Sequence, residues 1–157
     1  MKARRITLAT KIFKGITSMS QVNTFMIVSK DSSKVCGLYN FIRKLELNTV
    51  NDEHNEIRLD SLGMSNNSDW FMVMGELRNT YASNLKFWFE KTKNEHMLDD
   101  CYFFIEYELK GYIELVNIFS GEEVKIYDIL DGETEKEKEL ESILPMDYII
   151  DYFNSMI

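Results

Sequence analysis

The chain has 157 residues, of which 45% are hydrophobic and 13% aromatic, and this apolar content excludes a disordered chain and suffices for one domain with a sizeable core. Its 26 acidic residues outnumber 18 Lys and Arg, so the net charge of −8 disfavours nucleic-acid binding through a general basic surface. No apolar run approaches the ~20 residues of a membrane-spanning helix, and the two cysteines fit no disulfide framework. We therefore expect a cytoplasmic protein with no membrane partner.

Positive charge is concentrated at the N-terminus. Residues 1–30 carry six Lys or Arg and no acid, so this segment is +6 and the remainder −14. Residues 5–14 and 22–30 both have the pattern of strands, which predicts a basic hairpin beside an acidic sheet. The alternatives are an arm that contacts nucleic acid through residues 1–14 and an amphipathic targeting peptide.

A helix is predicted over about residues 33–47, because apolar residues recur there at spacings of three and four. Its apolar stripe consists of Val35, Leu38, Ile42 and Leu45. Ser32 or Ser33 is the expected N-terminal cap. Such a stripe is an ordinary core face, so we expect the helix to lie across one side of a sheet.

The sheet is expected within residues 56–130, because runs with alternating apolar residues follow one another there. The predicted strands are residues 56–60, 70–79, 84–93 and a meander within 101–130 that turns at Lys110-Gly111 and at Ser120-Gly121. Together with the N-terminal strands they predict an α+β fold: an antiparallel sheet of about six strands with helices packed mainly on one face.

The C-terminal segment, residues 133–157, is expected to be acidic and helical. Thr134 and Glu137 have the spacing of a capping box, and Pro145 is placed to start a final helix. That helix has an apolar stripe formed by Met146, Ile149, Ile150 and Phe153. We expect the stripe to dock on the sheet, within a single domain of residues 1–157.

The sequence predicts no catalytic residue, metal or cofactor. It contains no phosphate-binding loop, dinucleotide-binding turn, hydrolase elbow or zinc-protease motif. His54 and His96 lie in acidic stretches that offer ligand atoms without a fixed geometry. Cys36 and Cys101 have apolar neighbours, so both are expected to be buried thiols.

One enzymatic alternative is a metal-dependent nuclease-like hydrolase. Glu108 and Lys110 have the Glu-x-Lys spacing of carboxylate nucleases, with Asp99 or Asp100 upstream, and Glu123-Val124-Lys125 repeats it. Glu and Lys also alternate on any solvent-facing strand, so the spacing has little specificity.

The remaining signal is a predicted strand face on which aromatic and acidic residues are interleaved. Its members are Trp70, Trp88, Tyr102, Phe104, Glu106, Glu108, Tyr112 and Glu114. Aromatic anchors are favoured in protein interfaces, and an acidic surface speeds encounter with a basic target. The same face could instead be covered by the C-terminal helix and residues 1–30.

We therefore expect a small acidic protein that binds and neutralises a basic partner protein without catalysis. In size and composition the chain resembles the inhibitors and immunity proteins made against bacterial toxins and host defence nucleases, a resemblance that rests on no motif. A self-associating scaffold protein is a further alternative, and the oligomeric state does not follow from the sequence.

Overall fold

The computed structural model describes residues 21–49, 56–65, 69–128 and 130–155, and within them seven strands form one antiparallel sheet in the order β2-β3-β1-β4-β5-β6-β7. The elements in chain order are β1 (Val22–Ser29), α2 (Ser32–Thr49), β2 (Glu56–Met64), β3 (Phe71–Arg78), α3 (Ala82–Lys91), the 3-10 helix η1 (Glu95–Leu98), β4 (Tyr102–Glu106), β5 (Tyr112–Val116), β6 (Glu123–Asp128), β7 (Gly132–Glu133), α4 (Glu135–Glu141) and α5 (Met146–Ser155). The α+β class predicted from the sequence is confirmed.

The first half of the sheet has a split β-α-β topology. From β1 to β4 the chain runs strand, helix, strand, strand, helix, strand, with the spatial order β2-β3-β1-β4. The meander β4-β5-β6 then extends the sheet, and its predicted turns are confirmed by positive φ angles at Gly111 and Gly121. Of the basic hairpin predicted for residues 1–30, residues 1–20 lie outside the described residues, and the described strand β1 pairs with β3 and β4 and not with a preceding strand.

Strand β1 is the centre of the sheet. It pairs along its length with β3 on one side and β4 on the other, so that Met26 lies between Met74 and Phe104. From Asn23 to Ser29 every residue is buried. A strand buried on both faces requires cover on both sides, and helices provide it.

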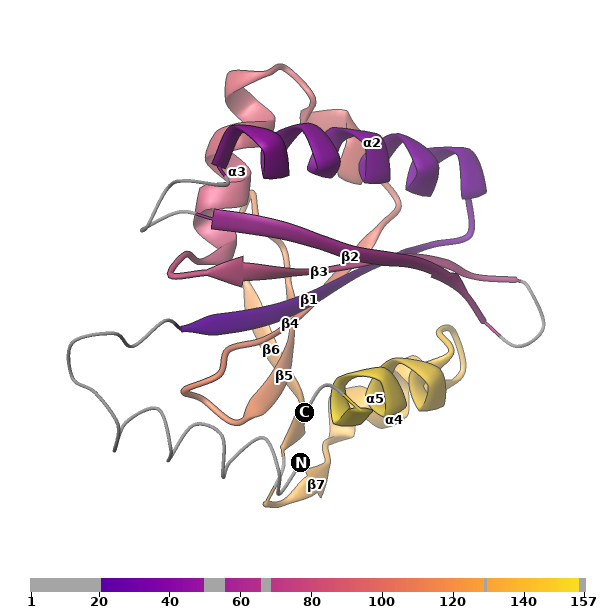
Figure 1. The fold of residues 1–157 in the computed structure, drawn as a ribbon. Coiled ribbons are helices and arrows are strands. Elements are labelled where there is room, and N and C mark those ends of the chain that lie inside the picture. Colours follow the sequence, from indigo (N-terminus) through magenta and orange to yellow (C-terminus); the bar gives the residue numbers. More distant parts are fainter. Residues whose placement is uncertain (1–20, 50–55, 66–68, 129, 156–157) are drawn as a thin grey trace.

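Helices cover both faces of the sheet, not mainly one as the sequence predicted. Figure 1 shows α2 and α3 on one side and α4 and α5 on the other. The first face packs against α2 and α3 in a core whose large members include Phe25, Leu38, Ile42 and Phe89. The second packs against α4 and α5 in a separate core that includes Met26, Phe104, Ile149 and Phe153. Burying such a side chain stabilises the fold by about 1.5–3 kcal/mol.

Helix α2 has the predicted buried stripe, but its N-terminal cap is not the residue that the sequence predicted. Val35, Leu38, Ile42 and Leu45 are all buried. The cap is Asp31, not Ser32 or Ser33: its Oδ1 accepts hydrogen bonds from the backbone N–H groups of Ser33 at 3.0 Å and Lys34 at 3.1 Å. The expectation of a buried thiol at Cys36 is wrong, because this residue lies on the exposed side of the helix.

The strand predicted at residues 84–93 is wrong, because this segment forms α3. Both neighbours of β3 in the sheet are already taken by β1 and β2, so the chain after β3 cannot add a hairpin strand beside it. It crosses back as a helix that buries Leu85 and Phe89, and the hydroxyl of Tyr107 accepts a hydrogen bond from the N–H of Ala82 at the helix start.

The C-terminal helices form as predicted. Thr134 caps α4 by accepting a hydrogen bond from the N–H of Glu137 at 3.2 Å, and its hydroxyl donates to the carbonyl of Ile126, which ties the helix to β6. The four stripe residues of α5 that the sequence indicated are all buried against the sheet.

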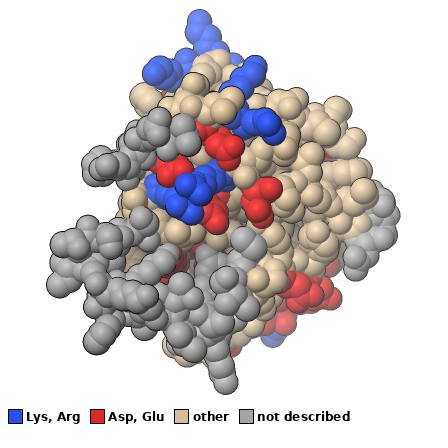
Figure 2. All heavy atoms as spheres, in the orientation of Figure 1, with Lys and Arg blue, Asp and Glu red and all other residues tan. Residues whose placement is uncertain are grey.

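Charged side chains of both signs are intermixed on the surface in the view of Figure 2, with acidic groups gathered over α4 and α5. None of the helices in the described segments is long and apolar enough to span a membrane.

Candidate binding groove

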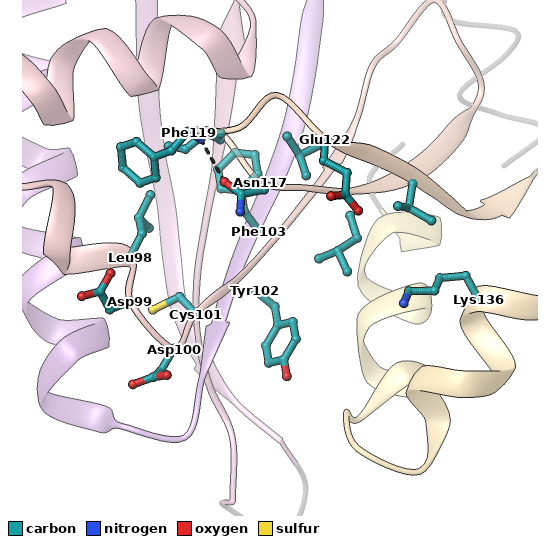
Figure 3. Close-up of a pocket in the computed structure, with 14 residues that line it drawn as sticks. Leu98, Asp99, Asp100, Cys101, Tyr102, Phe103, Asn117, Phe119, Glu122 and Lys136 are labelled. Atoms are coloured by element: carbon teal, nitrogen blue, oxygen red, sulfur yellow. Dashed lines mark hydrogen bonds between the residues drawn. The ribbon is translucent and has the colours of Figure 1, made fainter.

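The functional candidate with the most varied lining is a groove of about 440 Å³ between the start of β4, the β5–β6 hairpin and α4. Figure 3 shows the ring of Tyr102 and the side chain of Lys136 extending into this space from opposite sides, with Glu122 above them. The groove is open to solvent and combines an apolar floor with a charged rim.

Strand pairing creates the groove. In the antiparallel register Phe103 lies opposite Val116, so the loop that precedes β4 lies beside the loop that follows β5. Asn117 stabilises the second loop, because its Oδ1 accepts hydrogen bonds from the N–H groups of Phe119 and Ser120, each at 3.1 Å. This loop wall is therefore held by hydrogen bonds between the Asn117 side chain and the backbone.

The floor of the groove is apolar and partly open. Leu98, Tyr102, Leu115 and Val124 line it and are each only partly buried. Tyr102 packs edge-on against Trp70, with ring centroids 6.3 Å apart and planes at 67°. An aromatic ring fixed in this way, with one face toward a solvent-filled groove, is a suitable anchor for an apolar side chain of a ligand.

The rim has an excess of negative charge. Three acidic residues are exposed there, and the lining includes one basic residue. The acidic residues are Asp99, Asp100 and Glu122, and the basic residue is Lys136. Oδ2 of Asp99 lies 3.0 Å from Nδ1 of His96, whereas within the described residues the side chains of Asp100 and Glu122 make no ion pair. Two carboxylates remain available for a cationic ligand.

Cys101 lines the groove without the properties of a nucleophile. Burial raises the pKa of its thiol, an effect opposed by a hydrogen bond with Ser29 and by the charge of Lys34. A raised pKa keeps the thiol protonated near neutral pH, and the thiolate is the reactive form. This environment favours binding over covalent catalysis.

The predicted aromatic and acidic face is largely buried. Phe104, Glu106 and Glu114 are no more than 4% exposed, and Trp70 and Glu108 reach 9%. Phe104, Glu106 and Glu114 therefore offer almost no surface to a partner, and Phe104 belongs to the core that α4 and α5 cover.

The remaining members of the predicted face do not lie together. Trp88 is on α3 and packs against the core on the opposite side of the sheet. Tyr112 lies with its ring centroid 5.0 Å from Nζ of Lys125 and 5.8 Å from Nζ of Lys110. Of the eight residues, only Tyr102 lines the groove.

The nuclease pattern is not assembled into a site. Asp99 and Asp100 precede β4, whereas Glu108 and Lys110 follow it, so the two halves lie at opposite ends of that strand. The Glu108 carboxylate accepts a hydrogen bond from the N–H of Val22 at 2.7 Å, and Lys110 pairs with Glu114 at 3.1 Å. These contacts give both residues structural roles.

The second Glu-x-Lys sequence, Glu123-Val124-Lys125, also has its charged side chains in ion pairs within the protein. Glu123 lies 3.5 Å from Nζ of Lys110, and Lys125 lies 3.3 Å from Asp128. Glu114, beneath them, has a pKa raised by burial and by a hydrogen bond with Glu123, while Lys110 lowers it. The group is a network of ion pairs that links the β4–β5 turn to β6.

Possible metal ligands occur elsewhere. His96 is engaged with Asp99, and His54 lies outside the described residues. Glu133, Glu137 and Glu141 form a compact acidic group beside α4, separate from the groove lining.

Sequence reasoning missed most of the groove residues, among them Leu98, Asn117, Glu122 and Lys136. The acidic pair before β4 and the polar loop after β5 are visible in the sequence, and a meander places them side by side. Lys136 carries no such signal, since its position depends on how α4 packs against β6.

Comparison of the chain with protein-family models, with curated proteins and with solved structures gives no match.

Proposed function

We propose that this protein is a non-catalytic acidic binding protein that neutralises a basic partner protein, and that the groove accepts a segment of that partner with a basic and an apolar side chain. The observation that carries the proposal is the pairing of an apolar floor at Tyr102 with the rim carboxylates of Asp100 and Glu122. The net charge of −8 supports the same choice of partner, because it attracts cationic proteins over long distances.

The two parts of the groove have different roles in this proposal. A basic side chain pairs with the rim, which directs the segment into the groove and fixes its orientation. An apolar neighbour covers Tyr102 and Val124, and the displacement of water from these side chains provides the lasting affinity. The segment stays uncleaved, consistent with the protonated thiol of Cys101.

The test is quantitative affinity purification of the tagged chain from its native cells, with the wild type compared to Glu122→Lys. Asp151→Lys is the matched control, because Asp151 lies on the exposed side of α5 and does not line the groove. We expect a basic protein in a one-to-one complex with the wild type and the control. Binding of the purified partner to Glu122→Lys should be weaker by tenfold or more, about 1.4 kcal/mol.

Equal capture by all three proteins would place the interface outside the groove. A chain that elutes without a stoichiometric basic partner would contradict the neutralising function itself.

A further inference from the structure

Three glutamates converge where β7 meets α4. Glu133 ends β7, and Glu137 and Glu141 lie one turn apart on the same side of α4. One carboxylate oxygen from each lies within 4.8 Å of the others. The arrangement is held by the pairing of Glu133 with Tyr127 across the sheet and by the Thr134 cap.

The central member of this group is buried without a partner. Glu137 is 6% exposed, and within the described residues its Oε1 is inaccessible to water and makes no hydrogen bond. Leaving a buried carboxylate oxygen unsatisfied is unfavourable, so such an atom points to a ligand or a proton.

The charges around Glu137 are negative. Burial raises its pKa to about 7, with further contributions from Glu133, Glu141 and Asp147. Glu141 likewise has a raised pKa, through burial and through repulsion and a hydrogen bond with Glu133. Four carboxyl groups from β7, α4 and α5 therefore crowd one site.

The lysines of α4 form their ion pairs outside this group, although the charge of Lys138 lowers the pKa of Glu141. Lys136 pairs with Glu139 at 3.5 Å and Lys138 with Glu135 at 3.8 Å, both on the solvent side of the helix. Among the described residues, neither these lysines nor any other basic side chain forms an ion pair with Glu137.

The two outer glutamates, Glu133 and Glu141, are exposed to solvent. Glu141 and Asp147 line a shallow hollow of about 480 Å³ between the end of α4 and the start of α5. Figure 2 shows a small acidic patch in the region of these helices. Of the three glutamates, Glu141 borders this hollow.

We propose that Glu133, Glu137 and Glu141 bind a hard divalent cation, with Ca²⁺ preferred over Mg²⁺. All three ligands are carboxylate oxygens, the donors that these two ions select. Mg²⁺ keeps several of its waters and is usually held by one or two carboxylates, whereas Ca²⁺ accepts a larger set of protein oxygens, so three carboxylates at one site favour Ca²⁺. One oxygen of each glutamate lies within 4.8 Å of the others, a spacing that one ion with Ca–O distances of about 2.3–2.6 Å can bridge.

The ion would satisfy Oε1 of Glu137 and offset the repulsion between the glutamates. Since Glu133 belongs to the sheet and Glu137 to α4, a bound ion would also link the two elements. The inference is independent of the groove and of its partner.

The experiment uses the full chain freed of metal with EDTA, titrated separately with CaCl₂ and MgCl₂ at pH 8 by calorimetry. We expect one Ca²⁺ per chain with a Kd on the order of 10⁻⁴ M, and weaker binding of Mg²⁺. Two millimolar CaCl₂ should raise the Tm by ~4 °C.

Glu137→Gln removes one charge with little change in shape, and should weaken Ca²⁺ binding tenfold or more while leaving the chain folded without metal. Glu133→Gln tests the same site from the sheet side. The matched control is Glu139→Gln on the solvent side of α4, which should bind as the wild type does. No heat and no Tm shift with either ion, or undiminished binding by Glu137→Gln, would overturn the proposal and leave Glu137 as a protonated core residue.

Discussion

Gly75, in the middle of β3, has no space for a side chain. A Cβ atom at this position would lie 2.5 Å from the carbonyl oxygen of Arg58 and 2.7 Å from the ring of Phe25. Phe25 is fully buried and stacks on Phe103, so its ring cannot move aside without disturbing the core. We predict that Gly75→Ala lowers the free energy of unfolding by about 1–3 kcal/mol, measured by urea denaturation.

Gly37→Ala is the matched control. In α2 an added Cβ would approach only the end of Met97, at 3.6 Å, an ordinary contact. Alanine also has the higher helix propensity, so this variant should be more stable by up to ~1 kcal/mol. If both variants lose stability equally, the close approach at Gly75 is not the cause.

At the residue scale, the sequence predicted which side chains share a face but not whether that face is open. Alternation correctly placed Phe104 and Glu106 on one side of β4, and both are buried because the second face of the sheet is covered. The α5 stripe was visible in the sequence, yet its docking position depends on a core that it shares with residues far away in the chain, such as Met26 and Met72. Local pattern does not determine such contacts, nor how α4 packs against β6, which is why Lys136 was not predicted as part of the groove.

At the element scale, α3 shows the limit of periodicity. Leu85, Phe87 and Phe89 alternate as in a strand, whereas Leu85 and Phe89 are also one helical turn apart. The structure buries the helical pair and leaves Phe87 59% exposed. The choice follows from the topology, since β3 has no free edge for another strand. The longer patterns of α2, α5 and the meander were unambiguous and were predicted.

Helix α2 should depend on pH through its cap. The hydrogen bond from the Ser33 hydroxyl and the bond from the Lys34 N–H lower the pKa of Asp31 below its ordinary value of 3.8. A lowered folded-state pKa means that the carboxylate stabilises the fold above pH 3.8 and that this stabilisation is lost as pH falls through the folded pKa. We predict that the stability difference between wild type and Asp31→Asn shrinks from pH 6 to pH 2.5 in urea denaturation.

The control for this titration is Asp151→Asn. Asp151 is exposed on α5, and its side chain makes no hydrogen bond within the described part of the chain. The difference in free energy of unfolding between Asp151→Asn and wild type should change less over the same pH range. A constant difference for Asp31→Asn would show that the ionised form of the cap has no advantage over the amide.

At the scale of the whole molecule, the net charge of −8 opposes compactness, because like charges are closer in the folded chain than in the unfolded one. Salt screens this repulsion, with a Debye length that falls from about 20 Å at 20 mM to about 6 Å at 300 mM. We predict that raising NaCl over this range in the presence of EDTA increases the Tm by about 2–4 °C, measured by circular dichroism.

The comparison that isolates net charge is the double variant Glu90→Lys with Asp151→Lys, which brings the charge from −8 to −4. Both positions are exposed, and the pair of Glu90 with Lys86, at 3.8 Å, is a surface ion pair of little energetic weight. The double variant should therefore fold normally and show a smaller increase of Tm with salt. If its salt response equals that of the wild type, the stabilisation arises from specific ion binding or from salting-out of apolar surface, and the acidic excess has no measurable effect on stability.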